Sequence, residues 1–237
     1  MSGASPSPSP GAVAIIPARG GSKRIPMKNI RPIAGRPVLS YPVRTALESG
    51  LFARVLVSTD HPEIAAVARD WGAEVLERPD HLAGDAVPAG QVVEQVLRTL
   101  AAAGQLPEFY CNIYATAVLL RAEDLRGGFR RLEQDAQVDF VLSVSAFPLH
   151  PYKAMSAAAG YLRPVFLDQF YRPSQEFPDW VAPNGTFLWG RSQVLLDGVE
   201  PATSRRAGYR MPYLRAVDMD SPDDFTLAEH LLRMRAG

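Results

Sequence analysis

The chain has 237 residues, 47% of them hydrophobic, and its 25 basic side chains balance 25 acidic ones. A net charge of zero argues against a general nucleic-acid binder, which needs a surplus of cations, but it leaves room for a small anionic ligand. No apolar run approaches the ~18 residues of a membrane-spanning helix. The single cysteine, Cys111, excludes internal disulfides and a cysteine-based zinc cluster. We therefore expect a soluble, cytoplasmic protein with an ordinary hydrophobic core.

The start of the chain differs in composition from the rest. Residues 1–11 are mostly serine and proline, which bury little apolar surface, so we expect a disordered tail there. This stretch has neither the charged nor the apolar region of a secretory signal. Residues 12–237 have the length of one domain.

From residue 12 onward, short apolar segments alternate with amphipathic ones. The run AVAIIPA at 12–18 is rich in β-branched residues, which favours a strand buried on both faces. A basic loop at 19–29 follows, and then an amphipathic helix over 37–50, in which Pro42 indicates a kink or a late start. The next expected elements are strand 53–60, helix 62–72, strand 73–79, helix 92–104, strand 108–114, helix 122–135 and strand 138–147. This alternation predicts an α/β fold with a mainly parallel sheet covered on both faces.

The alternation stops at about residues 148–183, where six prolines and several aromatic residues occur. We expect an excursion from the sheet there, which forms a lid or a subunit contact. Beyond it we expect a strand over 185–190, a short helix near 191–198, a strand near 211–220 and a last helix from Ser221. That helix has a serine N-cap, proline at its first position and an acid at its third.

The loop after the first expected strand is the most informative segment. In an open α/β sheet, ligands bind beyond the carboxyl ends of the strands, where this loop lies. Gly20 and Gly21 let backbone N–H groups approach a ligand, and four cations suit a ligand with several phosphate charges: Arg19, Lys23, Arg24 and Lys28. The loop is neither GxGxxG nor GxxxxGK[ST], which disfavours a dinucleotide site and an ordinary P-loop. On charge alone, a solvated basic turn would be the better interpretation.

The order of residues in the loop favours a site. The loop reads Ala18-Arg19, Gly20-Gly21, Ser22-Lys23 and Pro26-Met27-Lys28-Asn29. Shorter motifs follow: VSTD at 57–60, Arg78-Pro79, YATAVLLR at 114–121, Pro183-Asn184-Gly185 and Val217-Asp218-Met219-Asp220. Together they resemble the cytidylyltransferases that activate nine-carbon sugar acids, the CMP-N-acylneuraminate (CMP-sialic acid) synthetase family, nearest its pseudaminic and legionaminic acid branch.

This resemblance implies a three-layer, Rossmann-like nucleotidyltransferase fold and a homodimer formed through the excursion. It implies a reaction in which the anomeric hydroxyl of a nine-carbon α-keto acid attacks the α-phosphorus of CTP and pyrophosphate leaves. The nucleotide would be held by Arg19, Gly20, Gly21, Ser22, Lys23, Lys28, Asn29 and Arg78. Of these, Asn29 and Arg78 would contact the cytosine and ribose. Arg19, Lys28 and Asp218 are the implied catalytic residues.

Two carboxylates near the chain end suit a metal. Asp218 and Asp220 flank one residue, so in an extended chain both point to the same face. Such a pair is more often an N-cap and a solvated neighbour, but Ser221 already supplies the cap. The resemblance implies that Asp218 and Asp220 hold Mg²⁺, with Mn²⁺ as a substitute.

The expected sugar contacts are Tyr114, Lys153, Gln175 and Asn184. Family members that act on sialic acid carry glutamine at the position of Tyr114. The YAT sequence and FPLHPYKA, which contains Lys153, resemble the pseudaminic acid branch, whereas Pro183-Asn184-Gly185 resembles the sialic and legionaminic branches. The acceptor is therefore left open among pseudaminic, legionaminic and N-acylneuraminic acids.

Two alternatives remain beside this interpretation. The first is a CMP-Kdo synthetase or another sugar nucleotidyltransferase, although the Kdo enzymes follow a related loop with Gly-Lys-Pro-Leu and this chain has Lys28-Asn29-Ile30. The second is a non-catalytic nucleotide-binding protein, which the presence of Lys28, Asp218 and Asp220 disfavours. No nucleic-acid or membrane partner is expected.

Overall fold

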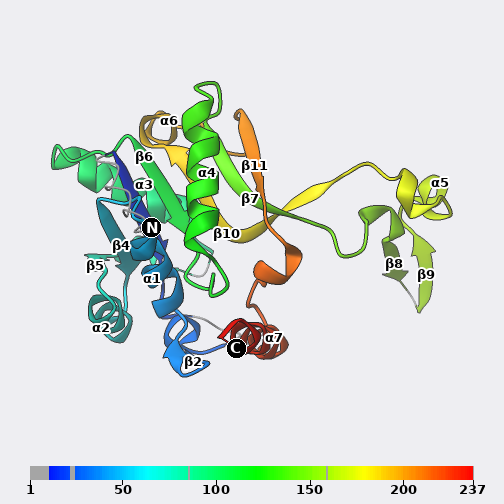
Figure 1. Cartoon of the computed structure of the whole chain (residues 1–237), viewed down its shortest axis with the longest axis horizontal. Coiled ribbons are helices and arrows are strands. Elements are labelled where there is room, and N and C mark those ends of the chain that lie inside the picture. Colours follow the sequence, from blue (N-terminus) through cyan, green and yellow to red (C-terminus); the bar gives the residue numbers. More distant parts are fainter. Residues whose placement is uncertain (1–10, 22–24, 85, 159, 237) are drawn as a thin grey trace, which may run out of the picture.

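The computed structural model describes residues 11–21, 25–84, 86–158 and 160–236 (Figure 1). Residues 1–10 of the expected tail lie outside the described residues, as do Ser22, Lys23 and Arg24 of the basic loop. None of the described helices is both long and apolar enough to cross a membrane.

A seven-stranded sheet forms the centre of the molecule, in the order β11-β7-β10-β6-β1-β4-β5. Its strands are β1 (Ala12–Pro17), β4 (Arg54–Thr59), β5 (Glu74–Glu77), β6 (Phe109–Ile113), β7 (Phe140–Ala146), β10 (Val181–Arg191) and β11 (Arg206–Arg210). β1 pairs in parallel with both β4 and β6, and β10 alone runs antiparallel to its neighbours. The parallel pairing brings the carboxyl ends of β1, β4 and β6 to the same edge of the sheet.

Helices cover both faces of this sheet. Those that pack against it are α1 (Ser40–Ser49), α2 (Pro62–Asp70), α3 (Ala89–Ala102), α4 (Ala122–Gln134) and α6 (Ser192–Leu196). α5 (Leu167–Phe170) lies away from the sheet (Figure 1), and α7 (Pro222–Ala236) packs in a separate core cluster with Ile33 and Val38. Ala14 and Ile16 of β1 pack in one core cluster with α1, α2 and α4, whereas Val13 and Ile15 pack in another with α3 and α6. Because successive strand residues point to opposite faces, an uninterrupted apolar strand is buried on both sides. The expected three-layer α/β fold is confirmed.

The prediction of a strand near 211–220 is wrong. Pairing in this region belongs to β11, which ends at Arg210, and Tyr213–Arg215 forms a single turn of 3-10 helix. Pro212 has no N–H to donate to a neighbouring strand, which explains why the pairing stops before it. The other expected helices and strands are present, with ends shifted by a few residues, and Pro42 lies in the first turn of α1.

Between Ala146 and Val181, which pair in the sheet, the chain forms an arm that extends away from the main body (Figure 1). The arm contains the antiparallel pair β8 (Met155–Ala158) and β9 (Tyr161–Pro164), together with α5. Aromatic rings gather where its two ends meet, with His150 and Tyr152 lying 4.9 and 4.8 Å from the Trp180 ring. A second small hairpin, β2 (Pro32–Ile33) and β3 (Arg36–Pro37), precedes α1.

Two consecutive glycines let α4 lie close to the sheet. A Cβ on Gly128 would come within 2.7 Å of the Phe187 ring and 2.9 Å of the Trp189 ring, and one on Gly127 would overlap the Tyr209 ring. Rigid aromatic side chains in a packed core cannot move away cheaply. Glycine at both positions is therefore required by packing against β10 and β11.

We expect Gly128→Ala to destabilise the protein by about 1–3 kcal/mol, since overpacking outweighs the ~1 kcal/mol that alanine usually gains over glycine in a helix. The matched control is Gly90→Ala in α3, where a Cβ meets nothing within 4 Å. That variant should be neutral or slightly more stable. Urea unfolding of both measures the difference, and equal stabilities would contradict the packing argument.

Candidate active site

A pocket of about 620 Å³ lies at the carboxyl edge of the parallel strands. Its walls come from the end of β1 and the following loop, the segments after β5 and β6, the start of α3 and the segment before α7. The lining residues are Pro17, Arg19, Lys28, Asn29, Arg78, Val87, Ala89, Val92, Tyr114, Ala115, Thr116, Asp218 and Asp220. Seven of the residues singled out from the sequence therefore lie around one cavity, although they span some 200 positions of the chain.

The loop after β1 is held in place by several hydrogen bonds. The Gly20 N–H donates to Asp60 Oδ1 at 3.1 Å, and Asn29 Nδ2 donates to the Arg19 carbonyl at 2.9 Å. A Cβ on Gly20 would lie 2.7 Å from the His61 ring, so this position requires glycine. Asn29 thus shapes the loop that carries Arg19, in addition to lining the pocket. Gly21 is exposed.

Arg78 is the buried cation of the pocket. Its Nη2 donates to the Ser58 carbonyl at 2.8 Å, and its Nε is buried with no hydrogen-bond partner among the described residues. Burial lowers the pKa of Arg78, the Asp60 carboxylate raises it, and the charge of Arg19 lowers it further. A guanidinium nevertheless stays charged in proteins. The pocket therefore offers a fixed, incompletely satisfied cationic donor, which suits a ligand with hydrogen-bond acceptors.

The acidic segment before α7 lines the pocket and contacts Lys28 of the basic loop. Lys28 Nζ donates to the Met219 carbonyl at 2.9 Å and lies 3.4 Å from Asp220 Oδ1. Met219 is fully buried, which fixes the residue between the two aspartates. The Asp220 N–H donates to the Asp218 carbonyl at 3.1 Å, so the chain turns here and is not extended. Both carboxylates still line the pocket, but their shared face results from this turn and not from strand alternation.

The start of α7 confirms the expected cap. Ser221 N–H donates to Asp224 Oδ2 at 2.7 Å, and Asp224 N–H donates back to Ser221 Oγ at 3.3 Å. The Asp220 N–H also donates to Asp224, at 3.1 Å. The bond from the Ser221 hydroxyl is the main reason that the pKa of Asp224 is lowered. Asp224 and Ser221 therefore serve the helix end, whereas Asp218 and Asp220 line the pocket.

The donor set of this segment suits a hard divalent cation. Among residues 11–21, 25–84, 86–158 and 160–236, no group of three histidine, cysteine or carboxylate side chains could enclose a metal. Asp218 and Asp220 supply two carboxylates beside an open cavity. Mg²⁺ is typically held by one or two carboxylates, with water and phosphate oxygens at the other positions.

The expected sugar contacts occupy different places. Tyr114 lines the pocket, and its pKa is raised by burial and, to a lesser extent, by the Asp218 carboxylate. Asn184 donates to Ser145 Oγ at 3.0 Å and lies next to Gly185, where a Cβ would be 3.7 Å from the Asp218 carboxyl. Tyr114, which follows β6, and Gly185 of β10 thus lie near Asp218, whereas the Asn184 side chain bonds to Ser145 and does not line the pocket.

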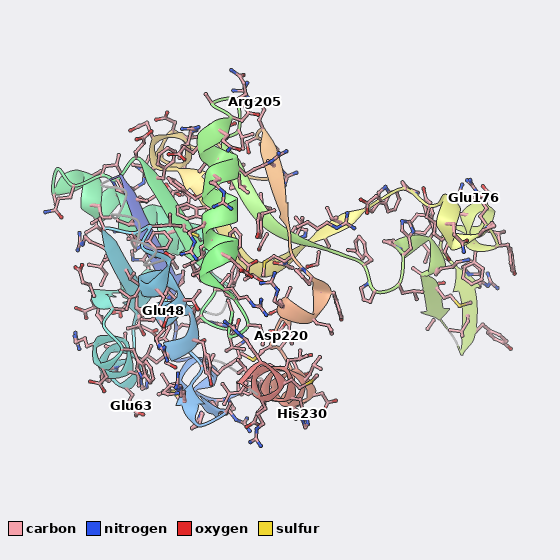
Figure 2. The ribbon with its side chains drawn as sticks, viewed as in Figure 1. Glu48, Glu63, Glu176, Arg205, Asp220 and His230 are labelled. Atoms are coloured by element: carbon pink, nitrogen blue, oxygen red, sulfur yellow. The ribbon has the colours of Figure 1, made fainter. Side chains whose placement is uncertain are left out.

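Lys153 and Gln175 lie on the arm and not at the pocket of their own chain. Figure 2 shows Glu176, the neighbour of Gln175, at the far end of the arm, and Asp220 near α7 on the main body. Lys153 Nζ donates to the carbonyls of Phe170 and Arg172, so it holds the arm together. Within one chain these two residues do not join the other expected contacts.

A second hollow, of about 200 Å³, lies between α3 and α6. Asn112 of β6 lines it, and its buried Oδ1 has no hydrogen-bond partner among the described residues. Asn112 lies two residues before Tyr114, so the hollow and the main pocket share one face of the sheet. The sequence did not point to this residue, although an asparagine within an apolar strand is the signal that could have done so.

Comparison with known proteins agrees with this geometry. Residues 13–155 match the family model described as cytidylyltransferase. The chain is 31% identical to a pseudaminic acid cytidylyltransferase of Campylobacter jejuni, covering 93% of this chain and 95% of that one. It is also 31% identical to N-acylneuraminate cytidylyltransferase A of Danio rerio, over 91% of this chain and 49% of the longer relative.

Solved structures share the fold at low sequence identity. A CMP:2-keto-3-deoxy-manno-octonic acid synthetase complexed with CTP superposes with a TM-score of 0.74 at 17% identity, over 94% of this chain and 99% of that one. A 4-diphosphocytidyl-2C-methyl-D-erythritol synthase gives 0.69 at 14% identity, over 93% and 97%. These similarities confirm the nucleotidyltransferase fold. With the family model and near full-length relatives at 31% identity, they show that the chain belongs to the cytidylyltransferase family.

Proposed function

We propose that this protein transfers CMP from CTP to the anomeric hydroxyl of a nine-carbon α-keto acid sugar and releases pyrophosphate. The observation that carries the proposal is one pocket in which Arg19, Lys28 and Arg78 face Asp218 and Asp220. Cations suit the triphosphate, and paired carboxylates suit the cation that accompanies it. The near full-length similarity to a pseudaminic acid cytidylyltransferase supports the sugar class.

The basic residues would bind and orient the nucleotide. Arg19 and Lys28 compensate the charge of the triphosphate and of the leaving pyrophosphate, together with Ser22, Lys23 and the N–H groups of the loop. Asn29 and the buried Arg78 would contact the cytosine and ribose. Fixed cations of this kind stabilise the transition state without any need for a covalent intermediate.

The acidic residues would serve the reacting atoms. Mg²⁺, or Mn²⁺, bound by Asp218 and Asp220 would neutralise phosphate oxygens and lower the pKa of the sugar hydroxyl. Asp218 is the nearer of the two to Asn184–Gly185, and Asp220 contacts Lys28. We therefore place the hydroxyl beside Asp218 and the phosphates beside Asp220 and Lys28. The new bond from the hydroxyl oxygen to the α-phosphorus would form as the bond to pyrophosphate breaks, and the hydroxyl proton would be lost to water.

The sugar would lie over Tyr114 and extend into the hollow beside Asn112. Tyr114 offers an aromatic surface to acyl groups. A 5,7-diacylamino sugar such as pseudaminic or legionaminic acid presents acyl groups of this kind.

We also propose a homodimer, acting in the cytoplasm, in which the arm reaches the partner's pocket. The arm exposes an unusual amount of apolar surface for a monomer, including Leu149, Tyr161, Leu162, Leu167 and Tyr171 at 61–81% exposure. Lys153 and Gln175 would then act on the sugar bound by the partner, with Lys153 contacting its carboxylate.

The proposed reaction is tested by pyrophosphate release from CTP, UTP and ATP with a panel of sugars. We expect turnover with CTP and a nine-carbon acid, and the highest kcat/KM with a 5,7-diacylamino sugar. Higher activity with Kdo would favour the alternative of a CMP-Kdo synthetase. Nucleotide binding without pyrophosphate release on any sugar would favour a non-catalytic protein, and equal rates with UTP or ATP would contradict the assignment of cytosine contacts.

Asp220→Asn should reduce kcat by about a hundredfold or more, because charge compensation at a phosphoryl centre accounts for several kcal/mol. Asp223→Asn is the matched control, since Asp223 lies in the first turn of α7 and does not line the pocket. Thermal melting should show both variants folded. A wild-type rate for Asp220→Asn in saturating Mg²⁺ would disprove the metal assignment.

Mixing two impaired variants, Lys153→Ala and Asp220→Asn, tests whether the arm acts across the dimer. Lys153→Ala should lower kcat/KM for the sugar about ten- to a hundredfold, through the lost carboxylate contact and the loosened arm, while KM for CTP changes little. Mixed dimers with Asp220→Asn contain one site with an intact pocket and an intact partner arm. Random exchange of subunits at equal amounts makes half of the dimers mixed, each with one intact site of two. The mixture should thus show about a quarter of the parent rate. No recovery, with mixed dimers verified by differential tags, would place Lys153 outside the partner's site.

A further inference from the structure

Asp124 is a fully buried carboxylate that the proposed chemistry does not use. It lies in the first turn of α4 and does not line the pocket. Its Oδ2 accepts from Arg215 Nη1 at 2.5 Å and from the Arg121 N–H at 3.1 Å, and its Oδ1 accepts from the Tyr209 hydroxyl at 3.3 Å. A buried charge is costly unless it is paired, so this ion pair is a specific feature of the fold.

The bond to the Arg121 N–H is an ordinary helix cap, but the pair with Arg215 is not needed for one. Arg215 lies in the 3-10 turn Tyr213–Arg215, three residues before Asp218. Its side chain is mostly buried, and it also approaches Glu123 Oε1 at 3.7 Å. Through Arg215, α4 therefore contacts the segment that leads directly into the acidic pair.

That segment has no strand pairing to hold it. At its start, Met211 N–H donates to the Val144 carbonyl at 2.8 Å, and Ser145 Oγ donates to the Met211 carbonyl at 3.0 Å. At its end, Asp224 accepts from the backbone of Asp220 and Ser221. The pair between Arg215 and Asp124 ties the middle of the segment to the main body. Met219 and Lys28 fix the segment after Asp218, so this pair is the side-chain contact that fixes it just before Asp218.

We propose that Asp124 is a positioning residue that acts through Arg215 to place Asp218 and Asp220 for cation binding. The inference rests on the proposed function, because the cation is the one assigned to that pair. It assigns a role in setting the metal affinity to α4, none of whose residues lines the pocket. Partners of this kind typically change metal affinity ten- to a hundredfold when removed.

Mn²⁺ binding, followed by the electron paramagnetic resonance signal of the free ion with and without CTP, tests the proposal apart from activity. Arg215→Met is the decisive variant. Loss of a positive charge near a cation site should tighten Mn²⁺ binding on electrostatic grounds, whereas loss of the positioning contact should weaken it. We expect affinity to fall ten- to a hundredfold.

Further variants distinguish an effect of the positioning contact on Mn²⁺ affinity from effects of net charge and of protein stability. Asp124→Asn should weaken Mn²⁺ binding. The double variant Asp124→Asn/Arg215→Met has the net charge of the parent, but its Mn²⁺ affinity should be as low as that of either single variant, because the two residues act as a unit. Tyr209→Phe removes the bond to the other oxygen of Asp124 and leaves the ion pair, so its Mn²⁺ affinity should equal that of the parent. If Arg215→Met folds poorly, Arg215→Lys replaces it in the test. Arg215→Lys retains the charge, so its Mn²⁺ affinity should lie between those expected for Arg215→Met and the parent.

Urea unfolding gives the folded fraction at which each affinity is compared. Mn²⁺ binding by Arg215→Met as tight as in the parent, or recovery of full affinity in the double variant, would overturn the inference while leaving the metal assignment intact. A parent protein that binds no Mn²⁺, with or without CTP, would overturn the metal assignment and the inference together.

Discussion

The parallel pairing of β1 with β4 and β6 is the constraint on which the rest of the molecule depends. β1 is apolar on both faces, so it is stable only in the middle of a sheet with helices on each side. In that position its carboxyl end lies next to those of its neighbours. The chain must leave the sheet there in loops. Those after β1 and β6 carry Arg19 and Tyr114, and Arg78 follows β5, which pairs in parallel with β4. The site is thus a consequence of burying one strand.

Opposite charges converge on the pocket from separate parts of the chain. The cations come from segments that follow strands, whereas Asp218 and Asp220 arrive on a segment that pairs with no strand and is fixed by buried Met219, by Lys28 and by the cap of α7. Strand pairing holds the basic side, and side-chain contacts hold the acidic side. The acidic side is therefore the part of the site whose geometry depends most on contacts at a distance, such as the pair between Arg215 and Asp124.

The arm follows a different principle. Its aromatic cluster around His150 and the bonds from Lys153 to two carbonyls stabilise the arm itself, yet its outer surface remains apolar. Exposed apolar surface of this kind is stable in water only at a cost, which association with another surface removes. The proposed dimer accounts for that surface and for the separation of Lys153 and Gln175 from the pocket of their own chain.

The sequence by itself determined the α/β class, most of the order of strands and helices, the basic loop and the cap of α7, because these follow from local periodicity and from neighbouring residues. It placed a strand near 211–220 because the acidic pair reads like an extended segment, and Pro212 prevents that pairing. Only the tertiary structure decided that Asp218 and Asp220 share the pocket through a turn, that Asn112 faces a hollow and that Asp124 contacts Arg215. Those contacts join residues tens of positions apart, and their geometry depends on how whole elements pack, which no local pattern encodes.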